Sequence, residues 1–225
     1  MDTTQVIDFL VQSQALKFGE FLLKSGRKAP YFINTGCFDT GDKISRLGRF
    51  YAEKLHSLGL HRADAVFGPA YKGIPLCVAA AMSLQQHYGV DIGFSFNRKE
   101  AKTRGEGGEF VGKPLSRGMK VVLVEDVVTA GTTLQEVVPV LRDRVGVEVA
   151  GVVILVDRSE KGAGSISAVQ QAERDLGIRV HPIVTIFDII SYLSRPNSSG
   201  FQIDAPLRSR IDEYRAEFGA PSLEA

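Results

Sequence analysis

Residues 121–133 read VVLVEDVVTAGTT, and this stretch decides the fold of the 225-residue chain. Its first four residues are aliphatic without polar alternation, which is typical of a strand buried on both faces in a parallel sheet flanked by helices. Two carboxylates, Glu125 and Asp126, follow where this strand should end. The small and hydroxyl residues around Gly131 then predict a turn whose backbone N–H groups face an anion at the start of a helix. The stretch therefore predicts a sugar-phosphate site.

An ordinary strand-to-helix turn is the alternative, because Asp and Thr cap helices and Gly allows positive φ. The commoner phosphate loops are excluded, since the sequence holds neither Gly-x-x-x-x-Gly-Lys-Ser/Thr nor Gly-x-Gly-x-x-Gly. The stretch instead resembles the phosphoribosyl-diphosphate (PRPP) motif of type I phosphoribosyltransferases, in which two acidic residues precede a Thr-Ala-Gly-Thr turn. This resemblance implies ribose contacts from the acidic pair and phosphate contacts from the turn. The implied PRPP-binding residues here are Glu125, Asp126, Val127, Val128, Thr129, Ala130, Gly131, Thr132 and Thr133.

Composition favours a single α/β domain over residues 1–225, with 44% hydrophobic and 24% charged residues. The formal net charge of +1 gives no general attraction for nucleic acid or for an anionic membrane surface. No run reaches about 18 apolar residues, and the first residues lack a basic start and an apolar core, so we expect neither a membrane span nor a signal peptide. We therefore expect a cytoplasmic protein with Cys37 and Cys77 as free thiols.

Strands and helices alternate along the chain, which predicts a doubly wound, mostly parallel sheet with ligands at the carboxyl ends of its strands. A helix and a hairpin with a basic connection precede this sheet within residues 1–36. The tail from residue 195 contains a polar helix ending near Phe218, to which we assign no function. The expected helices are 3–16, 44–58, 74–84, 134–141 and 165–176, and the expected strands are 18–23, 31–33, 65–68, 92–96, 121–124, 149–156 and 180–186.

Residues 97–113 fit neither a strand nor a helical period, and a loop of this length inside a compact domain is usually functional or disordered. A solvated mobile loop is one interpretation, since such loops commonly lie at the surface. A lid over pyrophosphate is the other, because it must supply positive charge and exclude water. Glycines provide the hinges, and we predict a mobile catalytic lid here. Its cations are Arg98, Lys99, Lys102, Arg104 and Lys113.

Further motifs resemble the orotate phosphoribosyltransferase family over about residues 5–195. They are KSGR at 24–27, PYF at 30–32, GPAYKGIP at 68–75, FNRKEAK at 96–102 and GEGG at 105–108. The resemblance implies transfer of the 5-phosphoribosyl group from PRPP to orotate, giving orotidine 5′-monophosphate and pyrophosphate. The transition state would resemble an oxocarbenium ion, with negative charge growing on the departing pyrophosphate. Residues 1–36 would form a hood on the base side of the site.

The resemblance also implies roles for individual residues. Pyrophosphate would contact Tyr71, Lys72, Arg98, Lys99, Lys102 and Arg104, of which Lys102 and Arg104 are the catalytic candidates. Orotate would contact Lys24, Phe32, Ile33, Thr129 and Arg158. Magnesium would be held by PRPP oxygens and water, without a direct protein ligand. The implied assembly is a homodimer in which each lid reaches the partner's site.

Arg104 departs from the family pattern, in which the residue before the GEGG run is commonly His. An arginine stays charged and cannot shuttle a proton, so we expect charge neutralisation to be the role at this position. Two alternatives remain open: a phosphoribosyltransferase for a purine base, and a regulatory protein that binds PRPP without catalysis. A purine enzyme has no need for Lys24 and Arg158 to meet a carboxylate, and a sensor has little use for a cationic lid.

Overall fold

The structure, a computed structural model, describes residues 2–23, 26–102, 108–128, 131–162 and 164–220, of which 100–102 and 108 are described by backbone alone. Its centre is a six-stranded sheet in the order β5-β4-β3-β6-β7-β8, in which β5 runs antiparallel to β4 and the other pairs are parallel. These strands are β3 Ala65–Phe67, β4 Gly93–Lys102, β5 Gly108–Gly112, β6 Lys120–Glu125, β7 Glu148–Asp157 and β8 Val180–Thr185. The predicted doubly wound, mostly parallel sheet is confirmed.

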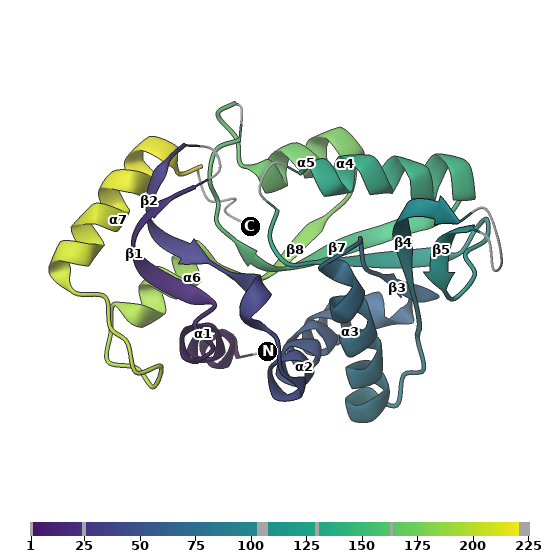
Figure 1. The fold of residues 1–225 in the computed structure, drawn as a ribbon, viewed down its shortest axis with the longest axis horizontal. Helices are drawn as coiled ribbons and strands as arrows, with labels where there is room; N and C mark the ends of the chain where they lie inside the picture. Colours follow the sequence, from purple (N-terminus) through teal and green to yellow (C-terminus); the bar gives the residue numbers. More distant parts are fainter. Residues whose placement is uncertain (1, 24–25, 103–107, 129–130, 163, 221–225) are drawn as a thin grey trace.

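Helices cover both faces of this sheet (Figure 1). On one face lie α2 Gly41–Ser57 and α3 Gly73–Tyr88, and on the other lie α4 Thr132–Pro139 and α5 Ala168–Leu176. Helix α4 continues as a π-helical turn, Val140–Val145. None of the helices in the described ranges is both long and apolar enough to cross a membrane.

Strand β6 is buried on both faces, as its aliphatic run predicts. Val122 and Val124 belong to one hydrophobic cluster with α1, α2 and α3, whereas Val121 and Leu123 belong to a second cluster with α4 and α5. All four side chains are fully shielded from water, and burying each one stabilises the fold by roughly 1.5–3 kcal/mol. Packing from both sides therefore fixes the strand that carries Glu125 at its carboxyl end.

Helix α2 packs closely on α3 because of a glycine. Its N-cap is Thr40, whose side chain accepts a hydrogen bond from the Lys43 N–H, and it ends before Gly59, which has a left-handed φ of +72°. Gly48 faces α3, and a Cβ at this position would lie 2.6 Å from the Ala79 carbonyl oxygen. This close contact fixes the position of α3, which begins directly after the loop that follows β3.

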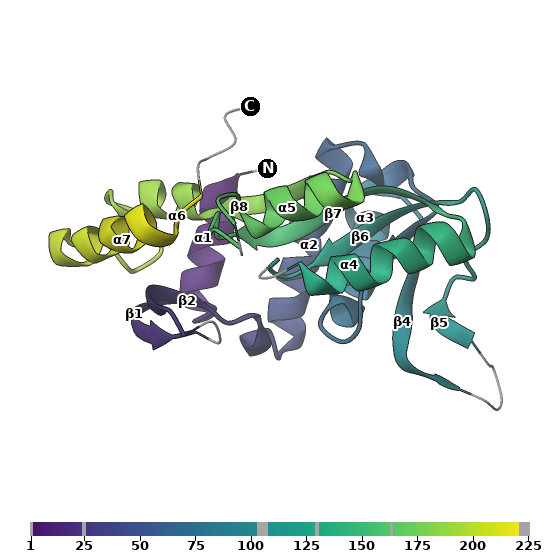
Figure 2. The same ribbon diagram turned by 90° about the horizontal axis from the view of Figure 1, so that it is seen from above.

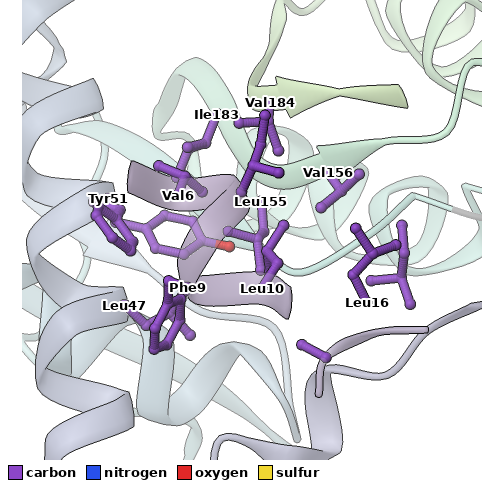
Figure 3. Close-up of a cluster of buried hydrophobic side chains, with 14 of the residues drawn as sticks. Val6, Phe9, Leu10, Leu16, Leu47, Tyr51, Leu155, Val156, Ile183 and Val184 are labelled. Carbon is purple, nitrogen blue, oxygen red and sulfur yellow. The ribbon is translucent and has the colours of Figure 1, made fainter. Parts of the chain in front are cut away.

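The N-terminal helix α1, Thr3–Gln12, packs against α2 and the strands β7 and β8. Figure 3 shows this contact, with labelled side chains from Val6, Phe9, Leu10, Leu47, Tyr51, Leu155, Val156, Ile183 and Val184. The helix ends earlier than the expected residue 16, because Gln14 has a positive φ of 59° and Leu16 already pairs with Ile33. Helix packing and hairpin pairing therefore compete for these residues, and pairing decides the boundary.

The predicted hood hairpin consists of β1 Leu16–Leu22 and β2 Lys28–Ile33, which pair in antiparallel fashion. A two-stranded hairpin is marginally stable by itself, and the C-terminal tail supports it. Tyr31 meets Tyr214 edge to face with ring centroids 5.8 Å apart, and Phe18 stacks on Phe201 at 4.7 Å. Helix α6, Ile186–Leu193, precedes the tail and was not predicted from the sequence, whereas the tail contains the predicted polar helix, α7 Ala205–Phe218. Figure 1 shows α7 beside the hairpin, so the tail braces the hood.

The expectation of an irregular loop over residues 97–113 is wrong for most of that range. β4 extends to Lys102 and β5 returns from Gly108, with Asn97 paired to Phe110. This hairpin forms the outer edge of the sheet and projects away from it (Figure 2). An edge strand with partly exposed side chains is defined by its backbone pairing and needs no alternation of apolar and polar residues. The lack of a strand period in residues 97–113 therefore did not exclude strands there. Residues 103–107 lie outside the described ranges, and the lid role stays a prediction.

Candidate active site

Two loops that are distant in the sequence meet at the carboxyl ends of β3 and β6, which are neighbouring parallel strands. The Lys72 ammonium, from the loop after β3, donates a hydrogen bond of 2.9 Å to Asp126 Oδ2, from the loop after β6. Ligands of open parallel sheets bind outside this edge. The structure thus brings together one residue predicted to bind pyrophosphate and one predicted to bind ribose.

The loop after β3 is folded tightly against the start of α3. A Cβ on Gly68 would lie 2.0 Å from the Gly73 carbonyl oxygen, so any larger residue would force the loop apart. The N–H of Ala70 donates to Asn97 Oδ1 at 2.8 Å, which ties the loop to β4. Tyr71 projects from this rigid loop with 70% of its surface exposed, so its ring is accessible to a ligand.

The acidic pair lies where β6 ends. Glu125 is the last residue of the strand, its Oε1 accepts the Asp126 N–H at 3.1 Å, and its carbonyl oxygen accepts the Tyr51 hydroxyl at 2.6 Å. Both carboxyl groups are buried, with residue exposures of 8% and 9%. Burial and then the neighbouring Asp126 charge raise the pKa of Glu125 to about 8. Two adjacent buried carboxyl groups therefore hold one proton near neutral pH.

Asp126 is the member of the pair that stays ionised. Burial opposes its charge, but the hydrogen bonds from Lys72 and Thr35 lower its pKa below the ordinary value. Its Oδ1 accepts the Val127 N–H at 2.8 Å, and its Oδ2 accepts both the Lys72 ammonium and the Thr35 hydroxyl. An anionic carboxylate held on both oxygens is a preorganised acceptor for sugar hydroxyls.

Thr35 is a site residue that the sequence analysis missed. It lies in a short 3₁₀ turn, Thr35–Cys37, directly after the hood strand β2. No motif marks it, and the contact that matters joins positions 91 residues apart in the sequence. Beside it lies a cavity of about 280 Å³. Polar residues Thr35, Tyr71, Lys72 and Asp126 and apolar residues such as Phe38 and Leu76 line this cavity.

The predicted phosphate turn is described in part. Gly131 has a φ of +73° and forms the N-cap of α4, and Thr132 and Thr133 are the first, exposed residues of that helix. Their position gives the turn the amide-rich helix start that an anion requires. Val128 is buried against the α4 side of the sheet, and Val127 is half-buried. Thr129 and Ala130 lie outside the described residues.

Arg158, expected to contact orotate, is buried next to the hood. Its Nη2 and Nε donate to Glu160 Oε1 at 2.7 and 3.0 Å, and its guanidinium carbon lies 4.8 Å from the centre of the Tyr31 ring. Tyr31 donates its hydroxyl to the same Glu160 oxygen at 2.7 Å. Arg215 of the tail donates to the Arg158 carbonyl oxygen at 3.2 Å. A strand-end arginine is usually at the surface, so this buried position depends on partners that the sequence did not indicate.

The other residues predicted on the base side lie in the hood strand β2. The Phe32 ring is partly exposed and stacks with Phe21 at 5.5 Å between centroids, and Ile33 is buried. Lys24 lies outside the described residues. The hood hairpin contacts Arg158 through the ring of Tyr31, whereas Phe32, the next residue of β2, points to the opposite side of the strand, so a joint orotate site stays a prediction.

Strand β4, which carries predicted lid cations, lies at the opposite end of the molecule from the hood hairpin (Figure 2). Arg98 and Lys99 are in β4, where Lys99 is exposed and Arg98 is half-buried. Lys102 is the last residue of β4, described by its backbone alone, and Arg104 lies outside the described residues. Within the described part of the chain, no group of three or more His, Cys, Asp or Glu side chains could hold a metal ion.

A parallel sheet with an acidic pair, a helix-start turn and a lysine loop at one edge has the features expected of a phosphoribosyltransferase. The family model described as "Phosphoribosyl transferase domain" matches residues 38–169. Orotate phosphoribosyltransferases of Photobacterium profundum and Klebsiella pneumoniae are 47% and 51% identical to the chain, each over 96% of this chain and 97% of the relative. The crystal structure of the Francisella tularensis orotate phosphoribosyltransferase superposes with a TM-score of 0.84 at 36% identity, covering 96% of this chain and 100% of that one. The chain belongs to the orotate phosphoribosyltransferase family.

Proposed function

We propose that this chain transfers the 5-phosphoribosyl group from PRPP to orotate, giving orotidine 5′-monophosphate and pyrophosphate. Family membership supports the reaction, and one observation carries its assignment to a particular edge of the fold. That observation is the contact of Lys72 with Asp126, which unites the loop predicted for pyrophosphate with the loop predicted for ribose. The reaction would serve pyrimidine synthesis, and the cytoplasmic location expected from the sequence stays a prediction.

In this proposal the donor side of the site uses groups of opposite charge. Asp126 and Glu125 accept hydrogen bonds from the ribose hydroxyls, and the turn at 127–133 holds the 5′-phosphate with backbone amides. Tyr71 and Lys72 contact pyrophosphate, and the cations Arg98, Lys99, Lys102 and Arg104 close over it. Fixed positive charge lowers the barrier, because negative charge grows on the leaving oxygens in the transition state.

On the base side, the proposed orotate contacts are Lys24, Phe32, Ile33, Thr129 and Arg158. Arg158 has five N–H donors, and Glu160 accepts from its Nε and Nη2. Donors therefore remain for the carboxylate of orotate, which favours orotate over a purine base. The buried surroundings of Arg158 strengthen such a charge-assisted hydrogen bond.

Magnesium fits this site as an ion carried by the substrate. Asp126 already accepts the Val127 N–H on Oδ1 and the Thr35 hydroxyl on Oδ2, and the raised pKa of Glu125 leaves that carboxyl protonated near neutral pH. Neither group is a free hard-oxygen ligand, so pyrophosphate, ribose and water oxygens would supply the coordination. When bound, the ion would neutralise charge on the leaving pyrophosphate.

A homodimer with shared lids is part of the proposal. The β4–β5 hairpin projects from the edge of the sheet away from the hood, as Figure 2 shows, which suits a lid that serves a second copy. Mixing two inactive variants tests this arrangement. An Arg98→Ala chain and an Asp126→Asn chain should regain part of the activity as a mixed dimer, because one of its two sites has an intact lid and an intact carboxylate.

The reaction itself is tested by pyrophosphate release from PRPP with orotate, hypoxanthine or no base. Orotate-dependent release is expected, whereas release with hypoxanthine would favour a purine enzyme. PRPP binding without release would favour a sensor. An Asp126→Asn chain purified in the same way reports any contaminating activity. Absence of orotate-dependent release above that background would overturn the proposal.

A further inference from the structure

Thr35 connects the hood to the donor side of the site, although no motif includes it. It follows the last residue of β2 by two positions and donates its hydroxyl to Asp126 Oδ2. Lys72 Nζ lies 2.9 Å from the Thr35 oxygen and 2.9 Å from Asp126 Oδ2. The three side chains thus form a closed triangle of hydrogen bonds.

The direction of each hydrogen bond in this triangle follows from its chemistry. An ammonium only donates and an ionised carboxylate only accepts, so Thr35 must accept from Lys72 and donate its single proton to Asp126. A hydroxyl polarised by a cation is a better donor, and the bonds in such a chain strengthen one another. Thr35 therefore donates its hydroxyl proton to the hydrogen bond with Asp126, and this bond stabilises the ionised form of the Asp126 carboxyl group.

PRPP binding must open this triangle on the lysine side. If Lys72 contacts pyrophosphate, as the proposed function requires, its ammonium can no longer give its full charge to Asp126. The carboxylate then keeps two donors from the protein: the Val127 N–H on Oδ1 and the Thr35 hydroxyl on Oδ2. Without the hydroxyl, Oδ2 would be buried with no donor from the described residues at the moment when it must bind ribose.

We propose that Thr35 is a positioning residue for PRPP, whose hydroxyl holds Asp126 in its ribose-binding orientation when Lys72 moves to pyrophosphate. The proposal rests on the proposed function and assigns Thr35 no contact with the reacting atoms. The proposal predicts a change in PRPP binding but not in orotate binding. The reason is that the hydrogen bonds of Thr35 described above reach neither Arg158 nor Phe32.

The groups that face Asp126 give the proposal a pH signature. Lys72 faces it from the loop after β3, Glu125 from β6 and Tyr51 from α2. Lys72 and Thr35 are the hydrogen-bond donors that lower the pKa of Asp126 against the effect of burial. Losing the Thr35 donor must raise this pKa, so a variant without the hydroxyl loses the anion, and with it ribose binding, at a higher pH than the native chain.

The test compares Thr35→Val, which removes the hydroxyl with little change of shape, with Thr35→Ser, which keeps it. Thr40→Val is the matched control, since Thr40 is a nearby threonine that caps α2 and does not contact Asp126. Binding of PRPP with Mg²⁺ is measured by calorimetry over a range of pH, and steady-state kinetics give the KM of each substrate. Thr35→Ala replaces Thr35→Val if the valine variant does not fold.

We expect Thr35→Val to weaken PRPP binding roughly tenfold, as for loss of a hydrogen bond to a charged group. The acidic limit of binding should move to higher pH, and the KM for orotate should not change. Thr35→Ser and Thr40→Val should match the native chain. A native chain that binds no PRPP would overturn the proposed function together with this role. Equal PRPP binding by the native and Thr35→Val chains, or equal loss in Thr35→Ser and Thr35→Val, would overturn the role of Thr35 alone.

Discussion

Replacing Glu160 by leucine should destabilise the protein strongly, because this carboxylate is the only anion paired with Arg158 among the described residues. The two side chains are 10% and 13% exposed, and the Glu160 Oε1 atom accepts two bonds from Arg158 and one from Tyr31. Leucine would leave a buried guanidinium and a buried phenol without their acceptor. Removing one partner of a buried ion pair typically costs about 3–5 kcal/mol, which is a large part of a domain's stability.

Urea unfolding followed by circular dichroism at fixed protein concentration measures this loss. Glu160→Gln is an informative second variant, since all three hydrogen bonds use one oxygen that an amide can replace. It should lie between the native chain and Glu160→Leu, because only the charge is lost. Asp212→Asn is the control for an exposed pair, in which Arg208 and Asp212 are 46% and 55% exposed, and should change stability by less than about 1 kcal/mol.

The double variant Arg158→Met with Glu160→Leu tests the reasoning directly. If the loss in Glu160→Leu comes from an unpaired buried charge, replacing the arginine as well should restore most of the stability. A Glu160→Leu chain within about 1 kcal/mol of the native chain would refute the argument, since water or another group would then have to satisfy Arg158. If Arg158 contacts orotate as proposed, Glu160→Gln should also raise the KM for orotate and leave PRPP binding unchanged.

Three further predictions concern other parts of the chain. The stability of the native protein should fall as pH rises from about 4.5 to about 8, because burial raises the pKa of Glu125 from its ordinary value of 4.5 to about 8 and the folded state holds the extra proton. Urea unfolding at several pH values should show a flatter dependence in Glu125→Gln, and an unchanged slope would contradict it. Gly48→Ala should destabilise by roughly 1–3 kcal/mol in thermal or urea melts, because its Cβ would lie 2.6 Å from the Ala79 carbonyl oxygen, whereas a neutral effect would show that α2 and α3 can separate freely. Arg104→His should keep orotate-dependent pyrophosphate release and Arg104→Gln should lose it if charge neutralisation is required, and full activity in Arg104→Gln would reject that role.

The sequence predicted those strands and helices in which the spacing of apolar residues shows which side chains are buried. Four aliphatic residues sufficed to predict that β6 is buried on both faces, and the spacing of apolar residues located α2 to within a few positions. The first half of β4 was predicted, but its end and β5 were missed, because strand pairing at an exposed edge depends on the partner strand and not on alternation within one strand. Propensity carries little information over residues 97–102, where the side chains of β4 are mostly polar or charged.

The residues of the candidate site could be predicted where they lie in one continuous motif. They could not be predicted where the contact joins residues far apart in the sequence. Glu125 and Asp126 follow a recognisable strand, but their different protonation depends on Lys72 and Thr35, which arrive from other loops. Arg158 is buried where Tyr31 and Glu160, 129 positions apart, meet it together with Arg215 of the tail. No pattern within a single segment contains that information.

If Thr35 positions Asp126 as proposed, its place in the chain links the donor side of the site to the base side. The shared phosphoribosyl transferase domain matches residues 38–169, which include Lys72 and Asp126 but neither the hood nor the tail. Tyr31 and Phe32 of the proposed base side and Thr35 of the donor side lie within five consecutive residues. Because the tail braces β2, we expect the hood to hold this short segment in one register, so that base and ribose are positioned by the same strand.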